Sequence, residues 1–194
     1  MDEFLESTTV IDWRHESVVS LARELSRDST GEVLTARRCF EWVRDEVEHS
    51  VDFQREEITC RASEVLAKQT GFCYAKSHLL AALLRANGIP AGFCYQRLSV
   101  NDDGSPYCLH GLSAVYLNDF GWYRADARGN RGSIQAEFSP PIERLSFSTS
   151  AEGEADFPEI HAAPLPCVLD SLTNASSVSA LCDNLPDVEP PISA

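Results

Sequence analysis

The sequence predicts an α+β fold in which a helical half precedes an antiparallel β-meander. Apolar residues recur every three to four positions through much of the first 90 residues, which is typical of amphipathic helices packed on one core. After Pro90 the chain becomes rich in aromatic and β-branched residues, with turn sequences between the runs, which is typical of strands. Because helices and strands are segregated along the chain, the pattern favours α+β over alternating βαβ units.

Four helices are predicted in the N-terminal half. Residues 16–28 and 31–49 each place apolar side chains on one face. A shorter helix fits residues 61–68, with Ser63 as its candidate N-cap. Residues 73–87 have the strongest helical pattern in the chain because Ala and Leu dominate them, and the Gly-Ile-Pro sequence that follows should end this helix.

Three strands are predicted after these helices, at residues 91–99, 109–117 and 121–126. Residues 128–164 are polar and contain frequent Pro and Gly, and residues 165–183 are predicted as a last helix.

The length of 194 residues predicts one domain over residues 1–194. Its core is expected at about residues 35–130. Residues 131–194 hold two basic and ten acidic residues and little apolar content. We therefore expect them to form an acidic C-terminal extension that wraps the core.

Charge and hydropathy exclude several classes of protein. The chain carries 30 acidic and 16 basic residues, a net charge of −14, and has no basic patch. Nucleic acids and anionic membranes repel such a surface. No window approaches 18 uninterrupted apolar residues, and the N-terminus has no basic region followed by an apolar run. The sequence therefore predicts a cytoplasmic protein that binds neither nucleic acid nor membrane.

Seven cysteines are an odd number, and none lies in a C-x-x-C pair. The nearest approach to a metal pattern is Cys108-Leu109-His110, which lacks a second pair of ligands. A thiol redox or metal protein is thus a weak alternative. Free thiols in a reducing compartment, with no metal and no cofactor, are the prediction.

Cys73 is the candidate nucleophile. It opens the helix at 73–87 directly after Gly71 and Phe72. Unpaired N–H groups and the macrodipole at a helix N-terminus favour a thiolate, and the N–H of Cys73 itself points to where an oxyanion would form.

His110 is the candidate base among five histidines. His78 lies five positions along the nucleophile's helix, about 140° around its axis, so it should point elsewhere. His15, His49 and His161 fall at predicted element edges, where solvated histidines are common. His110 instead begins a strand of the sheet expected to pack on that helix.

Asp126 is the candidate partner of His110, because a carboxylate on an aromatic-rich strand needs a partner. A two-residue turn between the two strands would put the two side chains on opposite faces. A three-residue loop over residues 118–120 would place Asp126 opposite Leu112, with His110 as its diagonal neighbour on the same face. The chemistry therefore requires the three-residue loop.

Three blocks of this sequence resemble bacterial transglutaminase-like proteins. They are residues 71–77 (GFCYAKS) with 83–91 (LLRANGIPA), residues 109–112 (LHGL), and residues 122–126 (WYRAD). The resemblance covers about residues 35–130, with Cys, His and Asp in the order of the family. It implies a papain-like fold in which the helix of the nucleophile packs against an antiparallel sheet that holds the other two residues.

The resemblance also implies an activity: a cysteine hydrolase or acyltransferase that acts on amide bonds through an acyl-enzyme, as cysteine proteases, amidases and transglutaminases do. Cys73, His110 and Asp126 would be catalytic, and the substrate would be a peptide or another amide-bearing molecule. Gln69, four residues before the nucleophile, is the candidate side-chain donor to the oxyanion. The alternative is a catalytically idle module that binds a peptide or protein partner in the same cleft.

Overall fold

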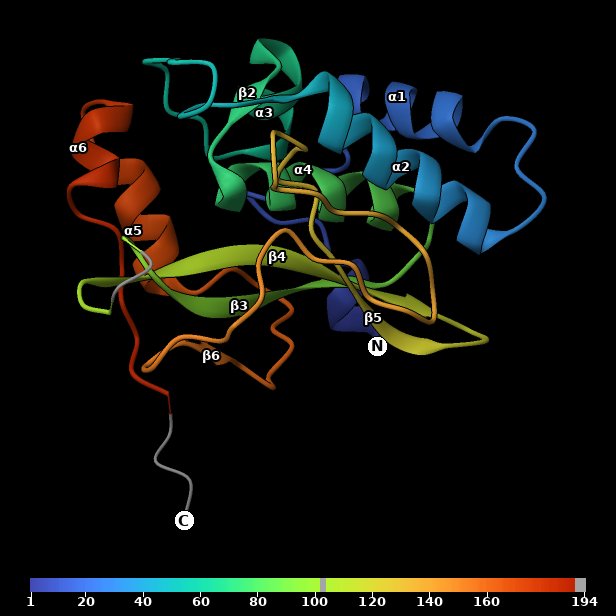
Figure 1. The fold of residues 1–194 in the computed structure, drawn as a ribbon. Helices are drawn as coiled ribbons and strands as arrows, with labels where there is room; N and C mark the ends of the chain where they lie inside the picture. The colour runs from blue at the N-terminus through green and yellow to red at the C-terminus, as the bar shows by residue number, and fades with distance from the viewer. Residues whose placement is uncertain (102–103, 191–194) are drawn as a thin grey trace.

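A computed structural model describes residues 1–101 and 104–190 of the chain. A layer of helices lies over one face of a curled four-stranded antiparallel sheet (Figure 1). The helices come first in the chain and the long strands follow them, so the predicted α+β arrangement is confirmed.

Helices α1 (Glu16–Ser26), α2 (Glu32–Glu46) and α3 (Ala62–Lys68) lie close to their predicted positions, whereas the short 3₁₀ helix η1 (Asp2–Leu5) was not predicted. Helix α2 ends earlier than predicted because Val47 adopts an extended conformation and the chain enters strand β1 (Glu48–His49). Ser63 is not the N-cap of α3, so that prediction is wrong; Arg61 occupies the cap position. The N–H and hydroxyl of Ser63 instead donate to the two oxygens of Asp12, at 3.0 and 2.5 Å.

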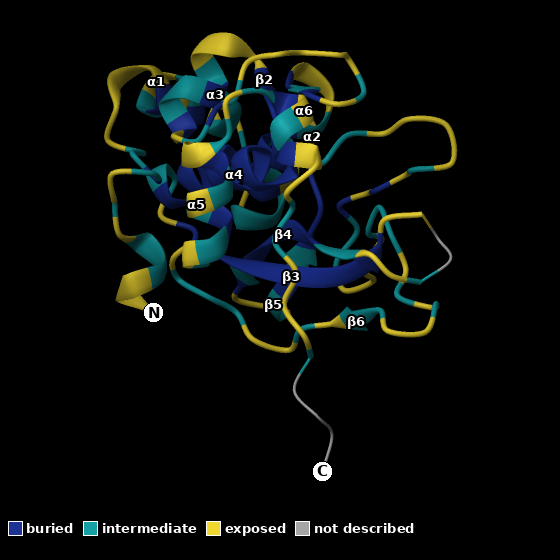
Figure 2. Ribbon diagram, turned by 90° about the vertical axis from the view of Figure 1, so that its left-hand side faces the viewer, coloured by how far each residue is buried: buried dark blue, intermediate teal, exposed yellow. Residues whose placement is uncertain are grey.

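Helix α4 (Cys73–Ala86) forms the centre of the molecule. Every residue from Cys73 to Arg85 is buried, because α1, α2 and α3 contact it on one side and β3 and β4 on the other (Figure 2). Gly88 adopts a positive φ of 72° just beyond the C-terminus, as the predicted stop requires. Within the described residues, no helix is both long and apolar enough to cross a membrane.

The sheet has the strand order β5-β4-β3-β6. Its strands are β3 (Ala91–Ser99), β4 (Tyr107–Leu117), β5 (Gly121–Ala125) and β6 (Ala155–Asp156). The first three match the predicted strands within two residues at each end, whereas β6 was not predicted. A separate parallel pair joins β1 to β2 (Thr70–Gly71), directly before α4.

The hairpin between β4 and β5 has the register that the candidate site requires. Ser113 pairs with Ala125 and Leu117 with Gly121, so the loop contains three residues. Gly121 adopts a positive φ of 73°, which a glycine permits at the end of such a loop. The next position after Ala125 is Asp126, which this register places opposite Leu112, with His110 as its diagonal neighbour.

Two apolar clusters cover the two faces of the sheet. The larger lies between the sheet and the helices, and Leu109, Val115 and Leu117 of β4 belong to it. The smaller contains the alternate residues Leu112 and Ala114, packed against side chains from β5 and the C-terminal extension. This alternation along β4 is the pleat of a strand that is buried on both faces.

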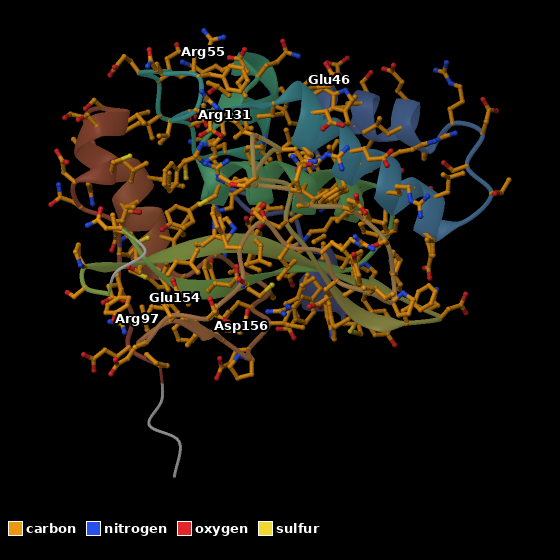
Figure 3. The ribbon with its side chains drawn as sticks, viewed as in Figure 1. Glu46, Arg55, Arg97, Arg131, Glu154 and Asp156 are labelled. Carbon is orange, nitrogen blue, oxygen red and sulfur yellow. The ribbon has the colours of Figure 1, made fainter. Side chains whose placement is uncertain are left out.

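The C-terminal extension packs on the core at several points. It contains two helices, α5 (Pro166–Asn174) and α6 (Val178–Cys182), rather than one predicted helix, because Ala175 is extended and Ser177 caps a new helix. Strand β6 pairs with β3. Figure 3 shows Glu154 and Asp156 of this segment close to Arg97 of β3, and the Arg97 guanidinium holds both Asp187 oxygens at 2.6 Å.

Candidate active site

The local fold places Cys73 at the start of α4. The parallel pairing of His49 with Gly71 directs the chain into the helix, and Phe72 takes the N-cap position. The first N–H groups of an α-helix have no intrahelical partner, so the peptide N–H of Cys73 is available to a ligand at this point. The Cys73 side chain is 4% exposed and lies in the wall of a cleft.

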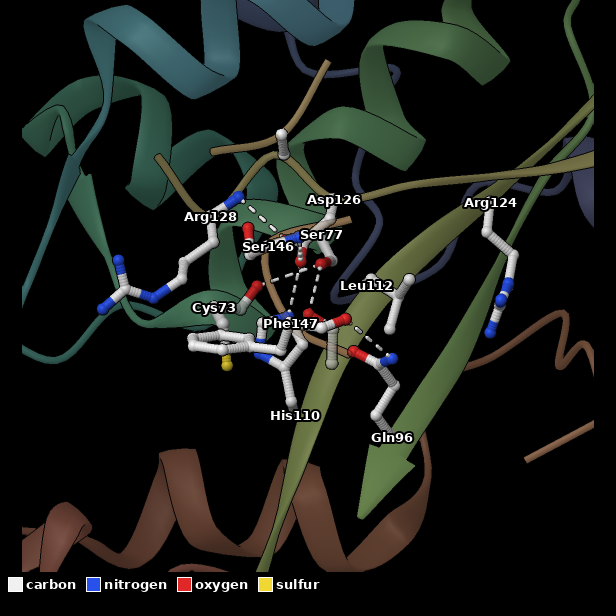
Figure 4. A network of polar contacts seen from close by, with 12 residues as sticks. Cys73, Ser77, Gln96, His110, Leu112, Arg124, Asp126, Arg128, Ser146 and Phe147 are labelled. Carbon is white, nitrogen blue, oxygen red and sulfur yellow. Dashed lines mark hydrogen bonds and ion pairs between the residues drawn. The ribbon is translucent and has the colours of Figure 1, made fainter. Parts of the chain in front are cut away.

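His110 and Asp126 form a buried pair. Nε2 of His110 lies 2.8 Å from Oδ2 of Asp126, and the two side chains are 5% and 1% exposed (Figure 4). Asp126 also accepts backbone hydrogen bonds at 3.1 Å from Ser146, on Oδ2, and from Arg128, on Oδ1. These three donors compensate the cost of burying the carboxylate.

The pair shifts the pKa of both members. Burial alone would lower the pKa of His110, but the charge and hydrogen bond of Asp126, aided by Cys73, outweigh burial and raise it to about 10. Burial would raise the pKa of Asp126, but the charge and hydrogen bond of His110 and the hydrogen bonds from Ser146 and Arg128 lower it to about 2. The geometry therefore favours an imidazolium beside a carboxylate at neutral pH.

Replacing Asp126 by Asn should lower the free energy of unfolding most between pH 3.8 and 6.5. The raised pKa of His110 means that its contribution is complete below 6.5 and is lost as the pH rises through about 10. The lowered pKa of Asp126 means that its contribution is complete above 3.8 and is lost as the pH falls through about 2. Urea unfolding of wild type and Asp126→Asn across this range should show a difference on the order of 3 kcal/mol that narrows on both sides. A difference independent of pH would contradict the ion pair.

The structure also brings Cys73 to this pair. The Cys73 thiol contributes a hydrogen bond and a charge interaction to the raised pKa of His110. Figure 4 shows the sulfur of Cys73 beside the His110 ring, with Asp126 beyond the ring. Because Asp126 occupies Nε2, Nδ1 is the ring nitrogen left for the sulfur.

A cleft of about 810 Å³ opens over these groups. Side chains from β3, β4, the loop after β1 and the C-terminal extension form its walls. The lining residues are His49, Val51, Phe72, Cys73, Leu98, Ser99, Val100, Cys108, Leu109, His110, Arg128, Ser133, Ile134, Ser146, Phe147, Ser148, Ser150, Ala151, Glu154, Cys182 and Leu185. Within the ranges that the structure describes, no group of three or more His, Cys, Asp or Glu side chains could hold a metal ion.

Phe147 and Arg128 complete the surroundings of the pair. The Phe147 ring packs edge-on against His110 with centroids 5.0 Å apart, and the Arg128 guanidinium lies 5.7 Å from the Phe147 centroid. Arg128 is held by both carboxylate oxygens of Asp52, at 2.7 and 3.1 Å. Sequence reasoning missed these contacts. Only the position of Arg128, two residues after Asp126, hinted at an Asx-type backbone bond.

His49 was expected to be solvated, and this expectation is wrong. It is 4% exposed and lines the cleft, because β1 pairs with the segment that leads into α4 and the His49 ring packs on Phe72 at 5.3 Å. Burial, together with the charge of Arg128, lowers the pKa of His49 to about 3, so this imidazole is neutral. The sequence signal was its position at the predicted end of a helix, which also suits a solvated side chain.

The structure does not bring Gln69 to the site. Gln69 is an exposed residue at the C-cap of α3 with a φ of 49° and is not among the residues that line the cleft. Its carbonyl accepts the N–H of Glu48 at 2.9 Å. The left-handed turn at Gln69 sends the chain into β2 and leaves its side chain outside.

All seven cysteines are free thiols. Burial raises the pKa of Cys39 to about 12 and raises that of Cys94 further. Cys108 and Cys182 line the cleft together with Cys73, and burial raises the pKa of both. Among the cleft thiols, only Cys73 contributes to the pKa of His110.

Comparison with solved structures identifies the fold. A "Putative Cysteine Protease" from Cytophaga hutchinsonii superposes with a TM-score of 0.53 at 20% identity, over 64% of this chain and 40% of that one. The periplasmic domain of TgpA from Pseudomonas aeruginosa gives 0.47 at 18% identity, over 64% of this chain and 45% of that one. The chain thus spans less than half the length of either structure. No curated protein matches it.

The family assignment agrees with this likeness and with the geometry. The architecture is an α+β papain-like fold, in which helix α4 packs on the antiparallel sheet. The model of the transglutaminase-like superfamily matches residues 19–127, which contain α2, α3, α4 and the strands from β3 to β5. This chain belongs to the transglutaminase-like superfamily.

Proposed function

We propose that this protein is a cysteine hydrolase or acyltransferase that acts on amide bonds through an acyl-enzyme. The observation that supports it best is the arrangement of Cys73, His110 and Asp126 in the wall of one cleft, with Asp126 2.8 Å from Nε2 of His110. A nucleophile, a base and a group that orients the base are the three parts that nucleophilic catalysis requires.

The chemistry follows from these positions. In the resting site the proton of the Cys73 thiol lies on Nδ1 of His110, and Asp126 stabilises the imidazolium of this thiolate–imidazolium pair. The thiolate attacks the carbonyl carbon, and the N–H of Cys73 stabilises the negative oxygen. The imidazolium then gives its proton to the leaving amine as the C–N bond breaks, which leaves a thioester. Water or an amine then attacks the thioester while His110 takes its proton. The product leaves as the C–S bond breaks, which restores the thiolate–imidazolium pair.

The cleft suits a short peptide or an amide-bearing side chain. Its volume of about 810 Å³ lies within the range typical of ligand sites, and its walls combine apolar side chains with serines. Residues 1–194 would act as one domain, because the acidic extension supplies Ser146 and Phe147 to the site. Seven free thiols support a reducing compartment such as the cytoplasm.

Brief labelling with iodoacetamide at pH 6 should modify Cys73 before the other six cysteines. An ordinary thiol is less than about 1% ionised at this pH, whereas a thiol paired with an imidazolium is largely ionised. Peptide mass spectrometry would locate the label, and His110→Ala should slow it. Labelling that begins at Cys182 or Cys108 while Cys73 stays protected would sink the proposal.

A panel of peptide amides, glutamine donors and activated esters then separates an enzyme from an idle module. We expect at least one class to leave an acyl group on Cys73, detectable as a mass increase of the intact protein that Cys73→Ala abolishes. Saturable binding of a peptide with no acyl-enzyme and no turnover for any class would favour the idle module.

A further inference from the structure

We propose that Tyr74 and Ser77 are positioning residues that hold His110 at its distance from Cys73. This inference rests on the proposed function. Both residues lie on α4, one and four positions after Cys73, and both hydroxyl groups donate to carbonyls of β4.

The two carbonyls are those of the residues on either side of His110. The hydroxyl of Tyr74 donates to the carbonyl of Leu109 at 2.6 Å, and Oγ of Ser77 lies 3.2 Å from the carbonyl of Gly111. Figure 4 shows Ser77 beside this network. These contacts fix the peptide groups on both sides of His110 to α4.

Ser77 also connects this contact to the nucleophile. Its Oγ also lies 3.0 Å from the carbonyl of Cys73. The one hydroxyl proton of Ser77 is therefore shared between the carbonyl of Cys73 on α4 and that of Gly111 on β4. A further hydrogen bond joins α4 to β4, because Oγ of Ser113 on β4 donates to the carbonyl of Ser77 on α4 at 3.4 Å.

Two carbonyls on this edge of β4 are left to the helix, while the N–H of Leu109 donates to the carbonyl of Pro186 at 2.8 Å. Strand β5 pairs with β4 from Ser113 to Leu117, and within the described residues no strand pairs with β4 on that side at Leu109 or Gly111. Side-chain hydroxyls therefore satisfy carbonyls that a longer β5 would have paired.

Gly111 makes the close approach of Tyr74 possible. A Cβ atom at residue 111 would lie 2.6 Å from Cδ1 of the Tyr74 ring, a distance that real Cβ contacts do not show. The ring packs against the backbone at Gly111, and its hydroxyl reaches the carbonyl of Leu109. If Tyr74 and Ser77 served only to pack α4 on β4, their hydroxyl groups would not need to donate to the two carbonyls that flank His110.

The test is the pH dependence of Cys73 alkylation by iodoacetamide, which needs no substrate. Wild type should show a rapid rate at pH 6 that His110→Ala removes. The double variant Tyr74→Phe/Ser77→Ala should lose roughly ten- to a hundredfold of the rate at pH 6, since small displacements of a reacting group have effects of this size. At pH 11, above the pKa of about 10 of His110, hydroxide ionises the thiol wherever the imidazole lies, so the rate of the double variant should stay within about twofold of wild type. With any identified substrate, kcat should fall while KM stays unchanged.

Tyr95→Phe is the matched control, because it removes another buried tyrosine hydroxyl, which accepts the N–H of Leu165 at 3.0 Å and donates to neither carbonyl that flanks His110. It should keep the wild-type profile. The single variants Tyr74→Phe and Ser77→Ala, each lacking one oxygen, give the same comparison if the double variant does not fold. A wild-type profile in the variants would overturn the positioning role and leave the proposed function standing. Absence of the rapid rate at pH 6 from wild type itself would overturn both.

Discussion

Cys73→Ala should reduce turnover of any amide or ester substrate by roughly 10⁴-fold or more, the scale of loss when a nucleophile that acts in concert with its base is removed. The alanine leaves Asp126 and His110 paired but provides no atom that can form the thioester. The variant should keep its fold, since Cys73 contributes one small side chain to the first turn of α4. Steady-state kinetics and circular dichroism on the same samples would measure both.

Cys108→Ala provides the matched control for this experiment. Cys108 lines the same cleft but lies on β4 and has its pKa raised by burial, so its thiol is the less reactive. We expect its kcat/KM to fall by no more than about tenfold, the low end of the effect of removing one small group from the wall of a pocket. A comparable loss in both variants would mean that cleft shape, and not a nucleophile, controls the activity.

Asp126→Asn should reduce kcat by roughly 10²- to 10⁴-fold while KM changes little, as expected when a carboxylate that orients a catalytic imidazole becomes an amide. In the structure Oδ2 of Asp126 accepts from both Nε2 of His110 and the N–H of Ser146. An amide has an oxygen on one side and an NH2 group on the other, so either the two donors at Oδ2 or the N–H of Arg128 at Oδ1 loses its acceptor. The imidazole also loses the charge that stabilises its protonated form.

Asp156→Asn is a suitable comparison. Asp156, on β6, is also a hydrogen-bonded carboxylate, and its Oδ1 accepts from Arg124 of β5 and Gln96 of β3. It should leave kcat within about twofold of wild type, as for a surface substitution. Equal losses in the two variants, or full activity in Asp126→Asn, would remove Asp126 from the catalytic assignment.

Much of the fold was predictable because local signals coincide with the packing. The Ala- and Leu-rich pattern of α4 marks a helix that is buried on all sides, and the Gly-Ile-Pro sequence marks its end. The distinction between a two- and a three-residue loop followed from the need to place His110 and Asp126 on one face, and the observed register agrees with it. Cys73 and Asp126 could be named because they lie at the ends of strong elements, and His110 because it lies on the strand expected to pack on the helix of Cys73.

The features that sequence reasoning missed depend on long-range contacts. Ser146 and Phe147 lie in a segment with no hydrophobic periodicity, yet they contact Asp126 and His110, 20 and 37 residues away in the chain. His49 is buried only because β1 pairs with β2, a two-residue contact across more than 20 residues. Gln69 was placed by its distance in sequence from Cys73, whereas a left-handed turn directs its side chain to solvent.

The support of the His110–Asp126 pair by a coil segment has a consequence for how such sites diversify. The family model ends at residue 127, whereas Ser146 and Phe147, which contact the pair, lie beyond it. A helix or strand in the core cannot change length without disturbing the packing around it, but a coil tolerates insertions and deletions. If the proposed function holds, insertions or deletions in this coil would change the residues that cover the imidazole, and with them the choice of substrate, while the helix and sheet that carry Cys73 and His110 stay the same.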